Sequence, residues 1–196
     1  HAGMSTFSPQ AAPPPPLAAA ATRALEHLIE AATRAGVEPD LSSAPRQALL
    51  RVFACSPYVV EQALRDPAGF IALLNEPGFE APRAADHHVL RCAAWSAGIT
   101  DEAALRRELR LYRHRETVRL ACRDLLGLAP LDEVLAELSA LADALVATAA
   151  DWLAQDLSRR FGHPADADGA PMSLVVIAMG KLGGRELNFS SDIDLM

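Results

Sequence analysis

Residues 173–195 read SLVVIAMGKLGGRELNFSSDIDL, and the pattern of the chain changes within this stretch. Residues 173–179 form a run that is apolar after Ser173 and β-branched at positions 175–177, which is typical of a strand covered on both faces. A glycine-rich turn follows, and a second strand is predicted to begin near Ser191. The residues before this stretch have helical periodicity. We therefore expect a mainly α protein, in which a helical bundle leads into the start of a truncated α/β domain.

Two carboxylates lie at the end of the quoted stretch. Asp192 and Asp194 are two residues apart on the predicted strand, so their side chains are expected on one face, with Ile193 on the other. Two like charges held this close repel each other unless a cation lies between them. Carboxylate oxygens suit Mg²⁺, which usually takes one or two protein carboxylates together with substrate phosphates. We therefore predict that Asp192 and Asp194 are catalytic residues that bind Mg²⁺.

The turn before these carboxylates has the composition of an anion-binding loop. Its glycines, Gly180, Gly183 and Gly184, allow backbone amides to approach a phosphate closely. Lys181 is the only lysine in the chain and places a compact ammonium group in this turn. Glycine pairs and Asp-x-Asp sequences each occur by chance, but their ordered combination after an apolar strand indicates phosphoryl or nucleotidyl transfer. The spacing is not that of a Walker loop.

The body of the chain is predicted to be a bundle of about six or seven helices over residues 17–162. Ser56 is a predicted N-cap with proline at the first helical position. Thr100 is the predicted cap of the first long helix, and Pro130 begins the second. The helices are expected at residues 17–35, from 56 to about 66, 84–97, 100–126 and 130–161, with a turn at 70–74.

The remaining segments complete the predicted domain organisation. Residues 1–16 contain a run of prolines and are predicted to be an extended tail. Residues 163–172 are a linker by composition. Residues 173–196 are predicted to begin a second domain. Because the sequence stops within a predicted strand, we expect it to be part of a longer protein.

Composition excludes several classes of function. The chain has 196 residues and a formal net charge of −7, which argues against a general nucleic-acid binder. No apolar run reaches the ~18 residues of a membrane span. Cys55, Cys92 and Cys122 have neither the spacing of a CxxC metal site nor that of a disulfide framework, so a reducing cytoplasm is expected.

The quoted stretch resembles the nucleotidyltransferase superfamily of the DNA polymerase beta type. Its signature is an apolar residue, a glycine, a small residue, about ten residues, and then Asp-x-Asp or Asp-x-Glu. Met179 and Gly180, followed after residues 182–191 by Asp192 and Asp194, match this layout. Lys181 departs from the usual small residue, so a hydroxyl contact to phosphate is not carried over to it.

Over residues 45–196 the sequence is similar to one family, the bifunctional glutamine synthetase adenylyltransferase/adenylyl-removing enzymes. The resemblance rests on the whole string 180–195, on residues 111–125 and 137–145, and on the Ser-Pro-Tyr at 56–58. Members carry two nucleotidyltransferase domains, and the amino-acid sequence of residues 186–192 resembles that of the first domain. By resemblance, this domain removes AMP from an adenylylated tyrosine of glutamine synthetase by phosphorolysis, giving ADP. The second domain adds AMP from ATP.

The resemblance also implies a site and partners. Asp192 and Asp194 would be Mg²⁺ ligands, and the phosphate or nucleotide pocket would be shaped by Gly180, Lys181, Gly183, Gly184 and Ser191. The third carboxylate of the superfamily comes from a later strand, so this piece alone is expected to be catalytically incomplete. The implied partners are glutamine synthetase, the PII signal protein, ATP, ADP and phosphate, with no nucleic acid and no membrane.

Two alternatives remain open from the sequence. The first is an enzyme of the PII uridylyltransferase type, which shares a glycine-rich turn and Asp-Ile-Asp but is expected to lack Lys-Leu-Gly-Gly. The second is a helical protein-interaction module whose nucleotide motif is not catalytic. A later strand bearing an Asp or Glu would favour an enzyme.

Other polar and aromatic residues have simpler interpretations. The arginines between Arg106 and Arg123 predict either a docking face for an acidic partner or, as we favour, a solvated face paired with Glu108, Glu116 and Asp124. The doublet of His87 and His88 has no acidic or cysteine residue at ligand spacing, which favours a surface or packing role. Trp95 and Trp152 are predicted to anchor the core. The predicted arginine face of the helix at residues 100–126 consists of Arg106, Arg107, Arg110, Arg113, Arg115, Arg119 and Arg123.

Overall fold

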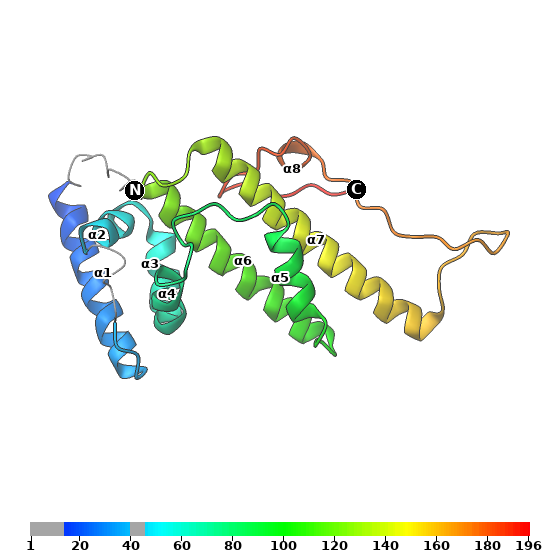
Figure 1. Cartoon of the computed structure of the whole chain (residues 1–196), viewed down its shortest axis with the longest axis horizontal. Coiled ribbons are helices and arrows are strands. Elements are labelled where there is room, and N and C mark those ends of the chain that lie inside the picture. Colours follow the sequence, from blue (N-terminus) through cyan, green and yellow to red (C-terminus); the bar gives the residue numbers. More distant parts are fainter. Residues whose placement is uncertain (1–13, 40–45) are drawn as a thin grey trace, which may run out of the picture. The chain divides into compact units, whose positions relative to one another are not determined.

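A computed structural model describes residues 14–39 and 46–196 (Figure 1). Within these residues the fold is mainly helical and contains no β-sheet, which confirms the mainly α expectation. Most of the predicted tail lies outside the described residues. The helices are α1 (Pro15–Arg34), α2 (Arg46–Cys55), α3 (Pro57–Arg65), α4 (Pro67–Leu74), α5 (His87–Ser96), α6 (Glu102–Leu125), α7 (Leu131–Phe161) and α8 (Gly180–Gly183).

The chain packs as two compact units. The first unit consists of the described residues up to Pro82 together with His114–Glu133. The second consists of Arg83–Arg113 and Val134–Met196. The second unit contains the predicted glycine turn and both aspartates.

The first unit is built on α1–α4 and the second half of α6. Its hydrophobic core includes Leu25 and Leu28 of α1, Val52 of α2, and Cys122 of α6, all of which are fully buried. Burial raises the pKa of the Cys122 thiol to about 12, because the thiolate cannot be solvated there. This core therefore joins segments from both ends of the unit's sequence.

Helix caps determine several boundaries in this unit. The Ser56 hydroxyl accepts a hydrogen bond from the Val59 amide at 3.2 Å, which confirms the predicted N-cap of α3. Residues 70–74, predicted as a turn, belong instead to α4. The reason is a second cap, since Asp66 Oδ1 accepts a hydrogen bond from the Gly69 amide at 2.9 Å, and Phe70 is buried.

Two further boundaries differ from prediction. Helix α1 begins within the predicted tail, at Pro15 and Pro16, because proline is compatible with the first turn, where the amides have no intrahelical partner. The cap of α6 is Asp101 rather than Thr100, since Asp101 Oδ1 accepts a hydrogen bond from the Ala104 amide at 2.8 Å. Helix α7 ends as predicted before Gly162, whose φ of +86° suits glycine.

The second unit has a smaller apolar core between α5, α6 and α7, which confirms the packing role predicted for both tryptophans. Trp95 packs against a buried cluster that contains Cys92, Tyr112 and Leu141. Trp152 is buried, and its indole nitrogen donates a hydrogen bond to the Ile99 carbonyl at 3.3 Å. No helix of the described residues is both long enough and apolar enough to cross a membrane.

The apolar run 173–179 differs most from expectation. It is extended, but its backbone pairs only near its end, where Ala178 forms an antiparallel bridge with Leu195. The side chain of Val175 is 70% exposed, so the prediction that this strand is covered on both faces is wrong for the described residues. Burial on both faces requires a further layer, and the described residues place none over this run.

Candidate functional site

The predicted glycine-rich turn forms a single helical turn, α8, followed by a Schellman motif. The Glu186 amide donates to the Lys181 carbonyl at 2.8 Å, and the Arg185 amide donates to the Leu182 carbonyl at 3.0 Å. Arg185 has a φ of +57°, the left-handed conformation this motif requires and glycine usually supplies. The turn therefore holds a non-glycine residue in a strained conformation.

Two glycines of the turn are needed for close backbone approach. A Cβ atom on Gly183 would lie 2.5 Å from the Ala178 carbonyl oxygen, well inside van der Waals contact. Gly180 has a φ of +55°, and a Cβ there would lie 3.3 Å from Asp194 Oδ2. The carboxylate of Asp194 therefore lies next to the first glycine of the turn.

Substitution of Gly183 by alanine is expected to open the turn, while Gly184→Ala is tolerated. A Cβ on Gly184 would have its nearest contact at 3.5 Å, an ordinary van der Waals distance. Overpacking at Gly183 costs about 1–3 kcal/mol. Amide hydrogen exchange over residues 183–186 measures this, and equal protection in the two variants would contradict the steric argument.

Backbone pairing brings Asp194 to the turn. The Met179 amide donates to the Asp194 carbonyl at 2.9 Å, so the residue before Gly180 is fixed beside the second aspartate. Asp192 and Asp194 are both exposed. Among the residues that the structure describes, no cation lies within ion-pair distance of either carboxylate, and Lys181 has no ion pair.

Ser191 supports the backbone before the aspartates. Its hydroxyl donates to Asn188 Oδ1 at 2.6 Å, and its amide donates to the Asn188 carbonyl at 3.1 Å. These bonds close a turn over residues 188–191, and the chain then extends through Asp192 and Asp194. Hydrogen bonding to Asn188 therefore gives Ser191 a structural role.

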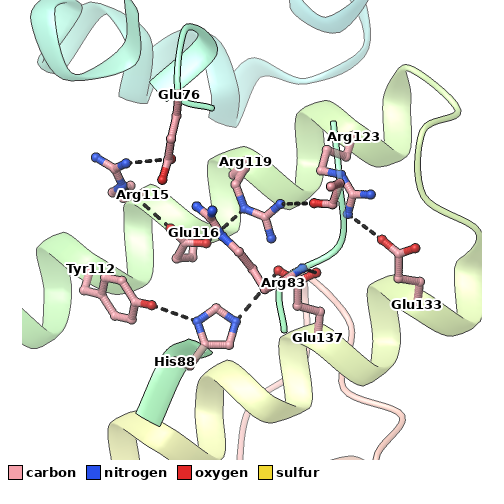
Figure 2. Close-up of polar contacts among 11 residues, drawn as sticks. Glu76, Arg83, His88, Tyr112, Arg115, Glu116, Arg119, Arg123, Glu133 and Glu137 are labelled. Atoms are coloured by element: carbon pink, nitrogen blue, oxygen red, sulfur yellow. Dashed lines mark hydrogen bonds and ion pairs between the residues drawn. The ribbon is translucent and has the colours of Figure 1, made fainter. Parts of the chain in front are cut away.

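The arginines of α6 are largely paired within the protein. Arg115 Nη2 lies 2.7 Å from Glu76 Oε2, Arg119 Nε lies 2.9 Å from Glu116 Oε2, and Arg123 pairs with Glu133 (Figure 2). Nearer the start of α6, Arg106 pairs with Glu102, and Arg107 with Glu108. These contacts support the paired interpretation of the face over a docking interpretation.

The predicted face is nevertheless not solvated throughout. Arg119 and Arg123 are 0% and 1% exposed, which corrects the expectation of a solvent-facing stripe. Arg119 Nη1 lies 3.4 Å from the Ala81 carbonyl, and Arg123 Nη2 lies 3.1 Å from the Glu80 carbonyl. The two guanidinium groups thus hold the segment that follows α4 inside the first unit. Arg110 is exposed.

His88 has an acidic neighbour that the sequence did not indicate. Its Nδ1 shares a hydrogen bond with the Tyr112 hydroxyl at 2.8 Å, and its Nε2 lies 3.8 Å from Glu137 Oε1 (Figure 2). His88 is 3% exposed and Glu137 7%. The packing role predicted for His88 is confirmed, and its acidic neighbour Glu137 lies 49 positions further along the chain, well outside the spacing of a local ligand motif.

Comparison with known proteins identifies the family. The family model described as glutamate-ammonia ligase adenylyltransferase matches residues 46–196. Several curated relatives are named bifunctional glutamine synthetase adenylyltransferase/adenylyl-removing enzyme. The relative from Thioalkalivibrio sulfidiphilus is 47% identical over 150 residues, covering 76% of this chain and 16% of the relative. The relative from Shewanella loihica is 44% identical over 162 residues, covering 81% of this chain and 17% of the relative.

The chain belongs to the glutamate-ammonia ligase adenylyltransferase family. A third relative, from Methylococcus capsulatus, is 42% identical over 157 residues, covering 80% of this chain. The matched region amounts to only 16–17% of the length of these relatives. The chain therefore corresponds to a small part of proteins of this kind.

Proposed function

We propose that this chain is part of an enzyme that regulates glutamine synthetase by Mg²⁺-dependent nucleotidyl transfer. Its motif would serve the adenylyl-removing half, which transfers AMP from an adenylylated tyrosine to phosphate and releases ADP. A second half of the longer protein would add AMP from ATP. The observation that carries the proposal is the position of the Asp194 carboxylate, whose Oδ2 would lie 3.3 Å from a Cβ added at Gly180, in a chain of this family.

The residues present fit a divalent cation. Asp192 and Asp194 offer hard oxygen ligands, are accessible, and are not neutralised by any described cation of the protein. When bound there, Mg²⁺ would supply charge neutralisation at the phosphorus that is attacked. The chain's own contribution is positional, because the start of the turn, residues 180–182, would present backbone amides and the Lys181 ammonium to phosphate oxygens, while the amides of Gly183 and Gly184 donate to the Met179 and Gly180 carbonyls.

The proposed reaction is a direct attack by phosphate and needs no nucleophile from the protein. An oxygen of inorganic phosphate forms a bond to the adenylyl phosphorus, and the bond from that phosphorus to the tyrosine oxygen breaks. The tyrosine takes up a proton and leaves as unmodified protein, and the other product is ADP. Glutamine synthetase, phosphate, ADP and ATP are thus the proposed partners, with the PII signal protein as a proposed regulator.

The test uses the full-length protein that contains this chain. Incubation with adenylylated glutamine synthetase, phosphate and Mg²⁺ is expected to yield ADP and unmodified glutamine synthetase. Chelation of the metal is expected to stop ADP formation, and added Mg²⁺ to restore it. Two results would contradict the proposal: ADP formation that persists in the chelator, or no transfer of AMP in either direction. The second would favour a helical interaction module.

A further inference from the structure

A buried hydroxyl on α7 contacts the motif of the second unit. Ser139 is 0% exposed, and its Oγ accepts a hydrogen bond from the Leu187 amide at 3.2 Å. The same hydroxyl donates a hydrogen bond to the Leu135 carbonyl at 2.8 Å. A serine hydroxyl can do both at once, because it has one hydrogen and two lone pairs. Ser139 therefore joins helix α7 to the segment between the glycine turn and the aspartates.

The hydrogen bond from the Leu187 amide to Ser139 lies in the part of the motif whose leucine side chains are buried. Leu182 and Leu187 are 3% and 7% exposed, while most of the neighbouring motif residues are exposed. A buried backbone amide needs a hydrogen-bond partner, and the Leu187 amide finds one in a side chain 48 positions earlier in the sequence. The hydroxyl of Ser139 thus selects where along α7 this segment docks.

A second contact from the same helix face supports this docking. Asp143 is one turn after Ser139, on the same side of α7. Its Oδ2 lies 3.8 Å from Arg185 Nη2. Arg185 is the residue held in the left-handed conformation, and this contact offers a reason for an arginine in place of glycine there. Both side chains are well exposed, so we expect this ion pair to stabilise the docking of the segment on α7 less than the Ser139 hydrogen bond does.

We propose that Ser139 is a positioning residue for nucleotidyl transfer. Through the Leu187 amide it fixes the distance between the glycine turn, which would hold phosphate, and Asp192, which would hold the metal. It touches neither substrate nor metal. This inference rests on the proposed function, since a positioned motif matters only if the motif transfers a nucleotide.

The same helix provides a matched control. Thr148 is also on α7, and its Oγ1 donates to the Ala144 carbonyl at 2.7 Å, in the same intrahelical pattern as Ser139. Its other interaction is with the thiol of Cys92, remote from the motif in sequence. Thr148→Ala therefore removes a half-buried hydroxyl from α7 without removing a contact to the motif.

The first experiment measures hydrogen exchange in the full-length protein. Ser139→Ala is expected to raise the exchange rate of the Leu187 amide by about 10-fold, the effect of losing one buried hydrogen bond. Thr148→Ala is expected to leave this amide unchanged. Equal exchange at Leu187 in the wild type and Ser139→Ala would overturn the inference.

The second experiment measures the reaction. In Ser139→Ala the kcat for ADP formation is expected to fall by about 10-fold, with KM for adenylylated glutamine synthetase unchanged, because a fully buried hydroxyl cannot contact that protein. Ser139→Thr, which retains the oxygen, is expected to recover most of kcat, and Thr148→Ala to retain it. If Ser139→Ala and Thr148→Ala have the same kcat, the positioning role is wrong.

Failure of the inference and failure of the proposed function give different results. If Asp192→Asn abolishes ADP formation while Ser139→Ala has full activity, only the positioning role is rejected. If Asp192→Asn retains full activity, the proposed metal site is rejected. In that case a change in Leu187 exchange would describe a structural contact alone and would overturn the positioning role as well.

Discussion

Replacement of Asp194 by asparagine is expected to lower phosphorolytic ADP formation by the full-length protein at least about 100-fold. The reason is the loss of one of two anionic oxygen ligands from the proposed metal site. Loss of a group that only supports a metal ligand already costs about 10- to 100-fold, and loss of a ligand should cost more. Asparagine has nearly the same volume as aspartate, and the backbone bond from Met179 to residue 194 does not involve the side chain.

The measurement should include a Mg²⁺ titration. Asp194→Asn is expected to shift half-maximal activation to higher Mg²⁺ concentration, and Asp192→Asn to behave alike. Asp168→Asn, the same substitution at an exposed linker position, serves as the control and is expected to leave the titration unchanged. If Asp194→Asn and Asp168→Asn have the same activity, the assignment of Asp194 to the metal site is wrong.

Replacement of Arg119 by methionine is expected to lower the free energy of unfolding by about 3–5 kcal/mol, the usual cost of removing one partner from a buried ion pair. The side chains of Arg119 and Glu116 are 0% and 1% exposed, and their charged atoms lie 2.9 Å apart. Without Arg119, the Glu116 charge would lose its 2.9 Å partner and remain in a medium that solvates it poorly, with the half-exposed Arg115 at the longer distance of 3.6 Å. Methionine approximates the length of the arginine stem, so the change is mainly one of charge and hydrogen bonding.

Urea unfolding of the chain, monitored by circular dichroism, measures this loss. Arg65→Met is the matched control, because Arg65 and Glu61 form an exposed ion pair at 3.2 Å, expected to contribute less than about 1 kcal/mol. The double variant Arg119→Met/Glu116→Gln is expected to recover part of the loss, since no charged carboxylate then remains at position 116. Equal effects of Arg119→Met and Arg65→Met would contradict the buried role.

Local signals in the sequence were sufficient for most helix boundaries. Ser56 and the following proline correctly predicted the start of α3, and Gly162 the end of α7. The order of glycine turn and Asp-x-Asp also indicated the family that the comparisons identify. The predicted cap of α6, Thr100, is one residue away from the observed cap, Asp101, because both side chains can accept a hydrogen bond from a helix amide. Helix α2 was not predicted, although Leu49, Val52 and Phe53 have helical spacing.

The sequence by itself determined the helical character, because helix periodicity, caps and prolines act over a few residues. It also determined the order of the motif. Only the tertiary structure decided that Arg119 and Arg123 are buried, that Glu137 lies beside His88, and that Ser139 binds the Leu187 amide. These contacts join residues that packing brings together, and periodicity states which face of a helix a residue occupies but not what covers that face.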